Sequence, residues 1–238
     1  MPSETLPEWE RVLSAAARLQ RVLPEAVLVG GTAPALYAAH RLSTDADHVL
    51  ADLRGRFDQV LAQLESVAGW TTARVRRPVQ ILGSLDGIET GVRQLIRSQP
   101  LETAELEVLG QKIVVPTEAE ILRIKGLLIL KRNATRDYLD FVALADYLGP
   151  DKSVEALRDF DRLYPQANGE SALQQLQIQL ANPLPYDLDE MNLAEHKNLD
   201  PRWHGWQSVK AACAGCATLI FDRITGLDGE EGGVRQGA

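Results

Sequence analysis

The spacing of apolar residues changes near residue 116, and this change limits the possible folds more than any other feature of the sequence. Before it, short extended segments are separated by turn signals such as Gly30-Gly31 and Asp86-Gly87. After it, apolar residues recur at helical intervals, beginning with the capping-box pattern Thr117-x-x-Glu120. Strands followed by helices predict an α+β fold, in which a mixed α/β core precedes a helical module.

The expected elements follow from these two spacings. Strands are predicted where short apolar or alternating runs lie between turns, over 26–29, 45–50, 70–77, 78–82, 88–95, 106–109 and 112–115. Helices are predicted over 8–22, 33–42, 52–64, 117–130, 135–148, 153–164, 170–181 and 203–225. We therefore expect a first domain over 1–149, made of a sheet core over 1–116 and a helical pair over 117–149. A helical module over 150–238, with a frayed glycine-rich tail, is expected to follow.

Charge and composition exclude several classes of protein. The 238 residues carry a net charge of -8, whereas a protein that coats nucleic acid in general is basic. Hydrophobic residues make up 45%, which is enough for a folded core and argues against disorder as the main state. The sequence shows neither a secretory signal nor an apolar run of bilayer length, so we expect a cytoplasmic protein without a membrane partner. Cys213 and Cys216 are the only cysteines, too few for a disulfide framework.

A pair of carboxylates lies on the second predicted strand. Side chains two residues apart on a strand point to the same face, so Asp45 and Asp47 present two carboxylates on one side. Two like charges this close are costly unless a cation or a shared proton compensates them. Oxygen ligands of this kind suit Mg²⁺ or Mn²⁺. We therefore predict that Asp45 and Asp47 bind one of these metal ions.

A twin-glycine turn precedes this acid pair. Gly30 and Gly31 follow the first predicted strand, and glycines let backbone amides approach a bulky anion closely. Thr32 begins the next helix, whose free N–H groups and dipole favour a phosphate. A phosphate cradle beside a metal-binding carboxylate pair describes a site for a metal–triphosphate complex. The chemistry that fits such a site is phosphoryl or nucleotidyl transfer.

These motifs resemble those of the nucleotidyltransferases of the DNA polymerase β superfamily. Gly30-Gly31-Thr32 followed by Asp45-x-Asp47 is similar to the superfamily's pattern, and the segment HRLSTDAD over 40–47 is similar to that of its AbiEii-type branch. AbiEii-type proteins are the toxin halves of type IV toxin–antitoxin and abortive-infection systems. The resemblance implies a nucleotidyltransferase-type mixed sheet, Mg²⁺ or Mn²⁺ at the acid pair, and triphosphate binding by Gly30, Gly31 and Thr32.

A second block of residues resembles the same branch. Lys125 is followed by Arg132 and by the segment RDYLDF, which begins at Arg136; the branch has a lysine followed by an Arg-Asp-aromatic-x-Asp helix. Lys125 also interrupts an apolar stretch, where a charged group normally needs a reason. The resemblance implies that Lys125, Arg132 and Arg136 bind the nucleotide. The simpler alternative is a solvated helix face with ordinary salt bridges, and Asp137 and Asp140 are expected to anchor the basic groups.

The third carboxylate of the family has no direct counterpart in this chain. When the sequence is aligned with the family pattern, Gly91 stands where the third acid is expected. Glu89 lies two residues earlier on the same strand face, and it is the expected replacement. In this family the third carboxylate helps to activate the attacking hydroxyl. Its absence therefore affects the expected turnover more than the expected binding of metal and nucleotide.

The resemblance implies a metal-dependent enzyme that moves a nucleoside monophosphate from an NTP to a hydroxyl acceptor. Asp45, Asp47 and Glu89 are its expected catalytic residues. The implied acceptor is an RNA, in particular a tRNA 3′ end, and the implied protein partner is an antitoxin. Two alternatives stay open. One is a catalytically silent member of the fold that binds a nucleotide or a partner, and the other is transfer to a hydroxyl of a small molecule or protein.

Two further groups of residues admit simpler explanations. Arg74, Arg76 and Arg77 form a small basic cluster, in which Arg74 and Arg76 share one strand face. This face suits either a polyanion or an ordinary exposed strand edge. The pattern Cys213-x-x-Cys216 lacks the second ligand pair of a structural zinc site, so we interpret 211–219 as a buried helix of small residues.

Overall fold

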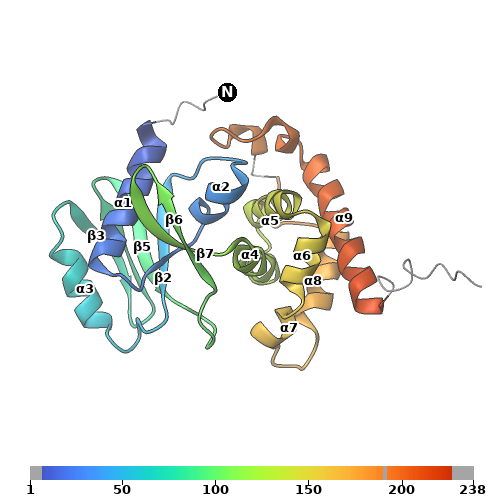
Figure 1. Ribbon diagram of the computed structural model, residues 1–238, viewed down its shortest axis with the longest axis horizontal. Coiled ribbons are helices and arrows are strands. Elements are labelled where there is room, and N and C mark those ends of the chain that lie inside the picture. The colour runs from blue at the N-terminus through green and yellow to red at the C-terminus, as the bar shows by residue number, and fades with distance from the viewer. Residues whose placement is uncertain (1–6, 190–191, 227–238) are drawn as a thin grey trace, which may run out of the picture. The chain divides into compact units, whose positions relative to one another are not determined.

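The computed structural model of the chain describes residues 7–189 and 192–226 (Figure 1). These residues form two compact units. The first contains the described residues up to Ile121 together with Glu195–Asp200, and the second contains the described residues of 122–194 and those from 201 onward. The predicted domain boundary at 149/150 differs from this division, because α5 (Thr135–Leu148) packs against the helices that follow it. The predicted frayed tail falls almost entirely on 227–238, outside the described residues.

A mixed five-stranded sheet is the centre of the first unit, as predicted (Figure 1). Its strands stand in the order β1-β2-β5-β4-β3; β2 and β5 are parallel, and every other neighbouring pair is antiparallel. The strands are β1 (Val27–Leu28), β2 (Asp45–Leu50), β3 (Trp70–Arg76), β4 (Gln80–Leu85) and β5 (Ile88–Gln94). The predicted hairpin forms a separate two-stranded sheet of β6 (Thr103–Val108) and β7 (Gln111–Pro116).

Two helices cover one face of the five-stranded sheet. These are α1 (Pro7–Val22), which contacts β2 and β5, and α3 (Phe57–Glu65), which contacts β3. Residues of β2 are alternately buried and half-buried, and the buried Ala46 and Leu50 join the core formed with α1. His48 points to the same buried face, and its burial lowers the pKa of the imidazole to about 4. The half-buried residues of β2, Asp45 and Asp47 among them, therefore point to the opposite face.

The helix after the twin-glycine turn is shorter than predicted. We expected a helix over 33–42, whereas α2 spans Thr32–Ala38. It ends because Ala39 adopts a left-handed conformation with a φ of 48°, which the helix cannot continue through. The segment that follows is then available to approach β2, where it contributes to the candidate site.

The second unit is helical, in agreement with the sequence. Its helices are α4 (Glu118–Arg132), which begins in the first unit, α5, α6 (Pro150–Leu157), α7 (Phe160–Leu163), α8 (Ala172–Ala181) and α9 (Trp206–Thr225). The helix predicted over 153–164 is two helices, separated at Arg158 and Asp159. The predicted start at 203 is a short 3-10 turn over Pro201–Trp203, and the extended backbone of Gly205 delays α9 to Trp206. Within the described ranges, no helix combines the length and apolar character needed to cross a membrane.

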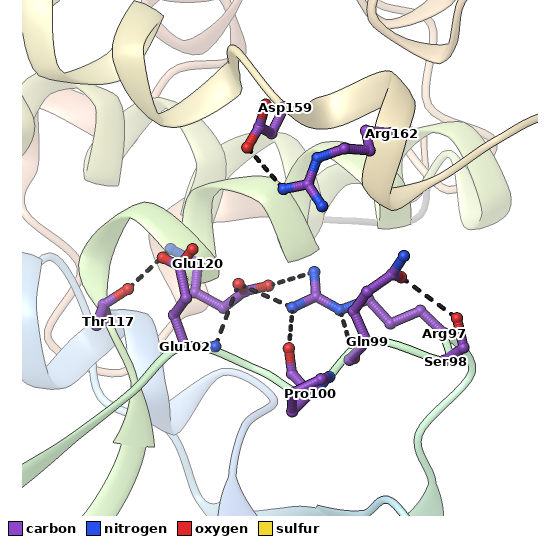
Figure 2. A network of polar contacts seen from close by, with 9 residues as sticks. All are labelled: Arg97, Ser98, Gln99, Pro100, Glu102, Thr117, Glu120, Asp159 and Arg162. Carbon is purple, nitrogen blue, oxygen red and sulfur yellow. Dashed lines mark hydrogen bonds and ion pairs between the residues drawn. The ribbon is translucent and has the colours of Figure 1, made fainter.

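A buried ion pair ties the first turn of α4 to the segment before β6 (Figure 2). The guanidinium of Arg97 meets the carboxylate of Glu120 through two contacts, of 2.8 and 3.0 Å, and the Glu120 side chain is fully buried. Arg97 also donates to the carbonyl oxygens of Gln99 and Pro100. One half of the predicted capping box forms, because the Thr117 hydroxyl accepts from the Glu120 N–H at 3.3 Å. The other half is replaced, since the Glu120 carboxylate is directed to Arg97.

Candidate functional site

The twin-glycine turn lies directly against the acid pair of β2. Gly30 has a φ of +71°, and a Cβ built on it would stand 3.2 Å from the Cβ of Asp47 and 3.6 Å from its Oδ2. The N–H of Val29 donates to the carbonyl oxygen of Asp47 at 2.8 Å, which joins the chain before the turn to β2. Glycine at position 30 thus allows the turn to approach the Asp47 carboxylate without an intervening side chain.

The second glycine lies against the segment that leads into β2. A Cβ on Gly31 would collide with a guanidinium nitrogen of Arg41 and would stand 3.0 Å from Oγ of Ser43. Arg41 and Ser43 are both buried. The turn is therefore backed by a buried positive charge, and its second position has no room for a larger residue.

Two hydroxyl groups position Asp45. The Thr32 hydroxyl donates to the main-chain carbonyl oxygen of Asp45 at 2.5 Å, and the Ser43 hydroxyl donates to the carboxylate oxygen Oδ1 at 2.6 Å. Thr32 is fully buried and holds the main chain of Asp45, so the predicted contact of Thr32 with a phosphate stays a prediction. The role of Ser43 was not found from the sequence, although the residue belongs to the motif that precedes the acid pair.

The parallel pairing of β2 and β5 brings the predicted third acid to the same face. Asp45 stands opposite Glu89, and Asp47 stands opposite Gly91. Directly paired residues point to one side of a sheet, so Glu89 shares the face of the two aspartates, on which it is exposed. Within the described part of the chain, no three His, Cys, Asp or Glu side chains are grouped closely enough to hold a metal ion together. The role of Glu89 as the replacement for the third acid stays a prediction.

The space above Gly91 is already filled. A Cβ built on Gly91 would stand 2.6 Å from the carbonyl oxygen of Ile81 and 2.6 Å from Cδ2 of Leu82, both on β4. These distances are far shorter than ordinary carbon contacts. An acidic side chain at the position expected for the family's third carboxylate therefore requires β4 to move.

An arginine that sequence analysis did not single out stands beside the acid pair. Nη2 of Arg93 lies 3.8 Å from Oδ1 of Asp47, and the two side chains are 44% and 25% exposed. An ion pair this exposed contributes little stability. The sequence feature that could have identified Arg93 is its position two residues after Gly91, because residues two apart share a strand face. Arg93 places a positive charge at the border of the acid pair.

The residues present fit one divalent cation that is bound together with a triphosphate. Mg²⁺ in proteins commonly takes one or two carboxylates and completes its coordination with water and substrate phosphates. Asp45 and Asp47 offer two carboxylates on one face, and the turn at Gly30 lies directly against Asp47. Mn²⁺ suits the same oxygen donors.

Two of the three predicted basic residues of the second unit, Lys125 and Arg132, are held by carboxylates. The ammonium of Lys125 lies 2.7 Å from Asp140 and 3.3 Å from Asp137, and all three side chains are buried. Arg132, which is 42% exposed, lies 3.1 Å from Asp137. The expected anchoring by Asp137 and Asp140 is thus confirmed. Arg136 is exposed on α5. Nucleotide binding by Lys125, Arg132 and Arg136 stays a prediction, and the Lys125 charge is already balanced within this cluster.

Comparison of sequences finds relatives that are much longer than this chain. No protein-family model matches it. The heme uptake protein MmpL11 of Mycobacterium tuberculosis is 29% identical over 227 residues, which cover 89% of this chain and 22% of that protein. The mycolic acid-containing lipids exporter MmpL11 of Mycolicibacterium smegmatis is 29% identical over 129 residues, which cover 53% and 13%. The chain spans about a fifth of the length of the first of these curated relatives.

Comparison of structures identifies the fold. A candidate nucleotidyltransferase from Helicobacter pylori superposes with a TM-score of 0.56 at 16% identity, covering 94% of this chain and 98% of that one. The protein JHP933 from Helicobacter pylori also gives a TM-score of 0.56 at 16% identity, with coverage of 95% and 96%. The chain therefore has the fold of these proteins over nearly its whole length, and the predicted nucleotidyltransferase-type mixed sheet with a helical module is confirmed.

Proposed function

We propose that this protein is a metal-dependent nucleotidyltransferase that moves a nucleoside monophosphate from an NTP to a hydroxyl acceptor. The observation that carries the proposal is the contact between the Gly30 turn and Asp47. It joins an anion-admitting backbone to a carboxylate pair, which are the two parts that a metal–triphosphate site requires. The shared fold with a candidate nucleotidyltransferase supports the same conclusion.

The site residues of the first unit have separate roles in this proposal. Asp45 and Asp47 would hold the Mg²⁺ or Mn²⁺ ion, which when bound neutralises phosphate charge and favours in-line attack at phosphorus. The backbone of the turn at Gly30 and Gly31 would bind the triphosphate, and Thr32 would hold the main chain of Asp45 beside it. Ser43 orients the Asp45 carboxylate through its 2.6 Å hydrogen bond. Glu89, exposed on the same face, would accept the proton of the attacking hydroxyl.

The proposed acceptor is the 3′ end of an RNA, with tRNA as the leading candidate. The support is the similarity of the 40–47 segment to AbiEii-type nucleotidyltransferases. The same similarity supports a toxin role with an antitoxin partner. Heme uptake and lipid export, which are named for the MmpL11 relatives, are not part of the proposal, because the match covers 22% or less of those proteins.

The test measures pyrophosphate release and nucleotide addition. The full chain is incubated with Mg²⁺, a total RNA pool and each of the four NTPs in turn, and the RNA is analysed by mass spectrometry for new 3′ residues. We expect addition that disappears in Asp45→Asn/Asp47→Asn, while circular dichroism shows an unchanged fold. Unchanged transfer by this double variant would refute the assignment of the acid pair.

A catalytically silent nucleotide-binding protein is the second candidate, and the packing at Gly91 favours it. Leu82 and the Ile81 carbonyl fill the space of the missing third acid. A silent protein would bind Mg²⁺–NTP in calorimetry and lose this binding in Asp45→Asn/Asp47→Asn, yet it would release no pyrophosphate with any NTP. The active enzyme would show both properties, so the two assays together separate the candidates.

A further inference from the structure

The face of the sheet that carries the acid pair also carries a set of arginines. Along one row of paired residues, Asp47 stands opposite Gly91, Gly91 opposite Leu82, and Leu82 opposite Arg74. Along the next row, Arg93 stands opposite Gln80, and Gln80 opposite Arg76. Because directly paired residues share a face, Arg74, Arg76 and Arg93 point to the same side as Asp47. The predicted shared face of Arg74 and Arg76 is thus confirmed.

These arginines are available to a ligand. Arg74 and Arg76 are exposed, and no carboxylate of the described residues lies within ion-pair distance of either. Arg93 is 44% exposed, and its contact with Asp47 is long at 3.8 Å. Other exposed arginines of the described residues that form ion pairs have a closer carboxylate, for example Arg162 with Asp159 at 2.7 Å. The cluster is therefore a local concentration of unneutralised charge in a chain whose net charge is -8.

A separate cavity, lined by residues 54–59 with Arg77 and Pro78, also contains arginines, but most of their charge is balanced. It has a volume of about 460 Å³ and is lined by Arg54, Arg56 and Arg77, among other residues. Arg56 and Arg77 are engaged by carboxylates, Arg56 by Asp52 and Glu25 and Arg77 by Asp58. Arg54 is exposed, and its side chain has no such partner among the described residues. Its N–H donates to the side chain of Gln94 at 2.9 Å; Gln94 stands opposite Leu50 of the buried core, so this contact places Arg54 off the face that carries Arg93.

We propose that Arg74, Arg76 and Arg93, the arginine face, bind the phosphodiester backbone of a single-stranded nucleic acid. The inference rests on the proposed function, because it assigns the acceptor-binding surface of the same site. The acid pair and Arg74 are three strands apart, which corresponds to about 14 Å at the usual spacing of strands. A triphosphate bound at Asp47 is too short to use the whole face, whereas a polynucleotide places successive phosphates along it.

The chemistry of the face favours a nucleic acid over a lipid surface. Guanidinium groups bind phosphate oxygens through two parallel hydrogen bonds, which suits discrete phosphodiesters. The neighbouring positions on the face include Gln80 and Ser84, whose side chains form hydrogen bonds and do not insert into a bilayer. A strand bound along the arginines would end at the acid pair, where its terminal hydroxyl is needed.

The experiment measures binding of short labelled single-stranded RNA and DNA to the full chain by fluorescence anisotropy, without NTP and over a series of salt concentrations. We expect Arg74→Ala/Arg76→Ala to weaken binding by about tenfold or more at low salt. The slope of log K against log salt should become shallower by about 1.4, because each lost phosphate contact on a single strand removes about 0.7. Arg74→Lys/Arg76→Lys keeps both positive charges, so its slope of log K against log salt should stay close to that of the unchanged protein.

The matched control is Arg158→Ala/Arg223→Ala, which removes the same charge from exposed positions of the second unit. It should bind as the unchanged protein does. An unaltered affinity and slope in Arg74→Ala/Arg76→Ala, or an equal loss in the control, would overturn the proposal. So would binding to vesicles of anionic lipid without binding to either oligonucleotide.

Two measurements separate this inference from the proposed function. Asp45→Asn/Asp47→Asn should still bind the oligonucleotides, since the arginine face is intact, and Arg74→Ala/Arg76→Ala should still bind Mg²⁺–NTP. If no transfer is detected but oligonucleotide binding depends on Arg74 and Arg76, the arginine face stands and the enzymatic proposal fails. If transfer occurs and the arginine variants bind and react normally, the enzymatic proposal stands and the arginine face fails.

Discussion

The Cβ of Asp47 occupies the space into which a side chain at position 30 would project, 3.2 Å from a Cβ built on Gly30. The φ of +71° at Gly30 adds a second requirement, because L-residues rarely adopt that conformation. The turn and the carboxylate are therefore placed by the same glycine.

Replacement of this glycine should damage stability and the site together. We expect Gly30→Ala to lower the free energy of unfolding by about 1 to 3 kcal/mol, because the left-handed backbone is strained for alanine and Asp47 must shift. Urea unfolding measures the loss, and Mg²⁺–NTP binding should weaken in the same variant. The control is Gly215→Ala in α9, where no atom lies within 4 Å of the added carbon and helix propensity favours alanine. Equal stability of the two variants would contradict this account.

An acid at position 91 should not restore a third carboxylate. Gly91→Asp forces its Cβ against the Ile81 carbonyl and Leu82, and overpacking of this kind costs about 1 to 3 kcal/mol. We expect a lower melting temperature and no gain in pyrophosphate release. In Gly91→Asp/Leu82→Ala the destabilisation should be smaller than the sum of the two single effects, since one substitution makes room for the other. Strict additivity would show that Leu82 is not the obstacle.

Removal of Lys125 should destabilise the second unit. Lys125→Met leaves the buried carboxylates of Asp137 and Asp140 without their shared cation, and breaking such a group costs about 3 to 5 kcal/mol. Arg132→Ala removes a partner that is 42% exposed, and its cost should stay below about 1 kcal/mol. Chemical denaturation compares the two. A Lys125→Met protein of normal stability that fails to bind NTP would instead favour a direct role for Lys125 at the nucleotide.

The cysteines of α9 should make stability fall at alkaline pH. Burial raises the pKa of Cys216 to about 11 and raises that of Cys213 well above its usual range. As pH rises above about 9, the thiols ionise in the unfolded state but stay protonated in the folded state, so the unfolded state binds fewer protons and stability decreases. Urea unfolding between pH 9 and 10 should show a steeper decrease for the unchanged protein than for Cys213→Ala/Cys216→Ala. Identical slopes would mean that the thiols are accessible in the folded protein.

Local spacing predicted the elements well wherever burial alone decides the conformation. The strand over 45–50 and the helix over 135–148 have the predicted bounds; the helix follows an uninterrupted helical pattern, and the burial of the strand alternates residue by residue. The helix ends that differ from the prediction depend on single backbone conformations, such as the left-handed conformation of Ala39 that ends α2. These conformations are set by contacts with distant segments, which apolar spacing does not reveal.

The sequence predicted the glycine turn and the acid pair, but it did not predict the residues that surround them. The motif spacing placed the glycine turn and the acid pair, and the structure brings Gly30 and Asp47 together. The parallel pairing of β2 with β5, which places Arg93 beside Asp47, joins strands about forty residues apart and has no local signal. Lys125 was identified as unusual because it interrupts an apolar stretch. Its two carboxylate partners lie on the next helix, and only helix packing determines that they meet it.

The packing of Leu82 over Gly91 has a consequence for the routes by which such a sequence can evolve. A first mutation to an acid at 91 meets an occupied space, and a first mutation that shortens Leu82 loses apolar contact with nothing gained. Neither single substitution is expected to be neutral, and the effect of each depends on the other. A sequence that has both Gly91 and Leu82 therefore gains a third acid only through coupled substitutions. Because the Ile81 carbonyl belongs to the main chain, natural variants that carry an acid at this strand position should carry both a smaller residue at the position of Leu82 and a displaced β4.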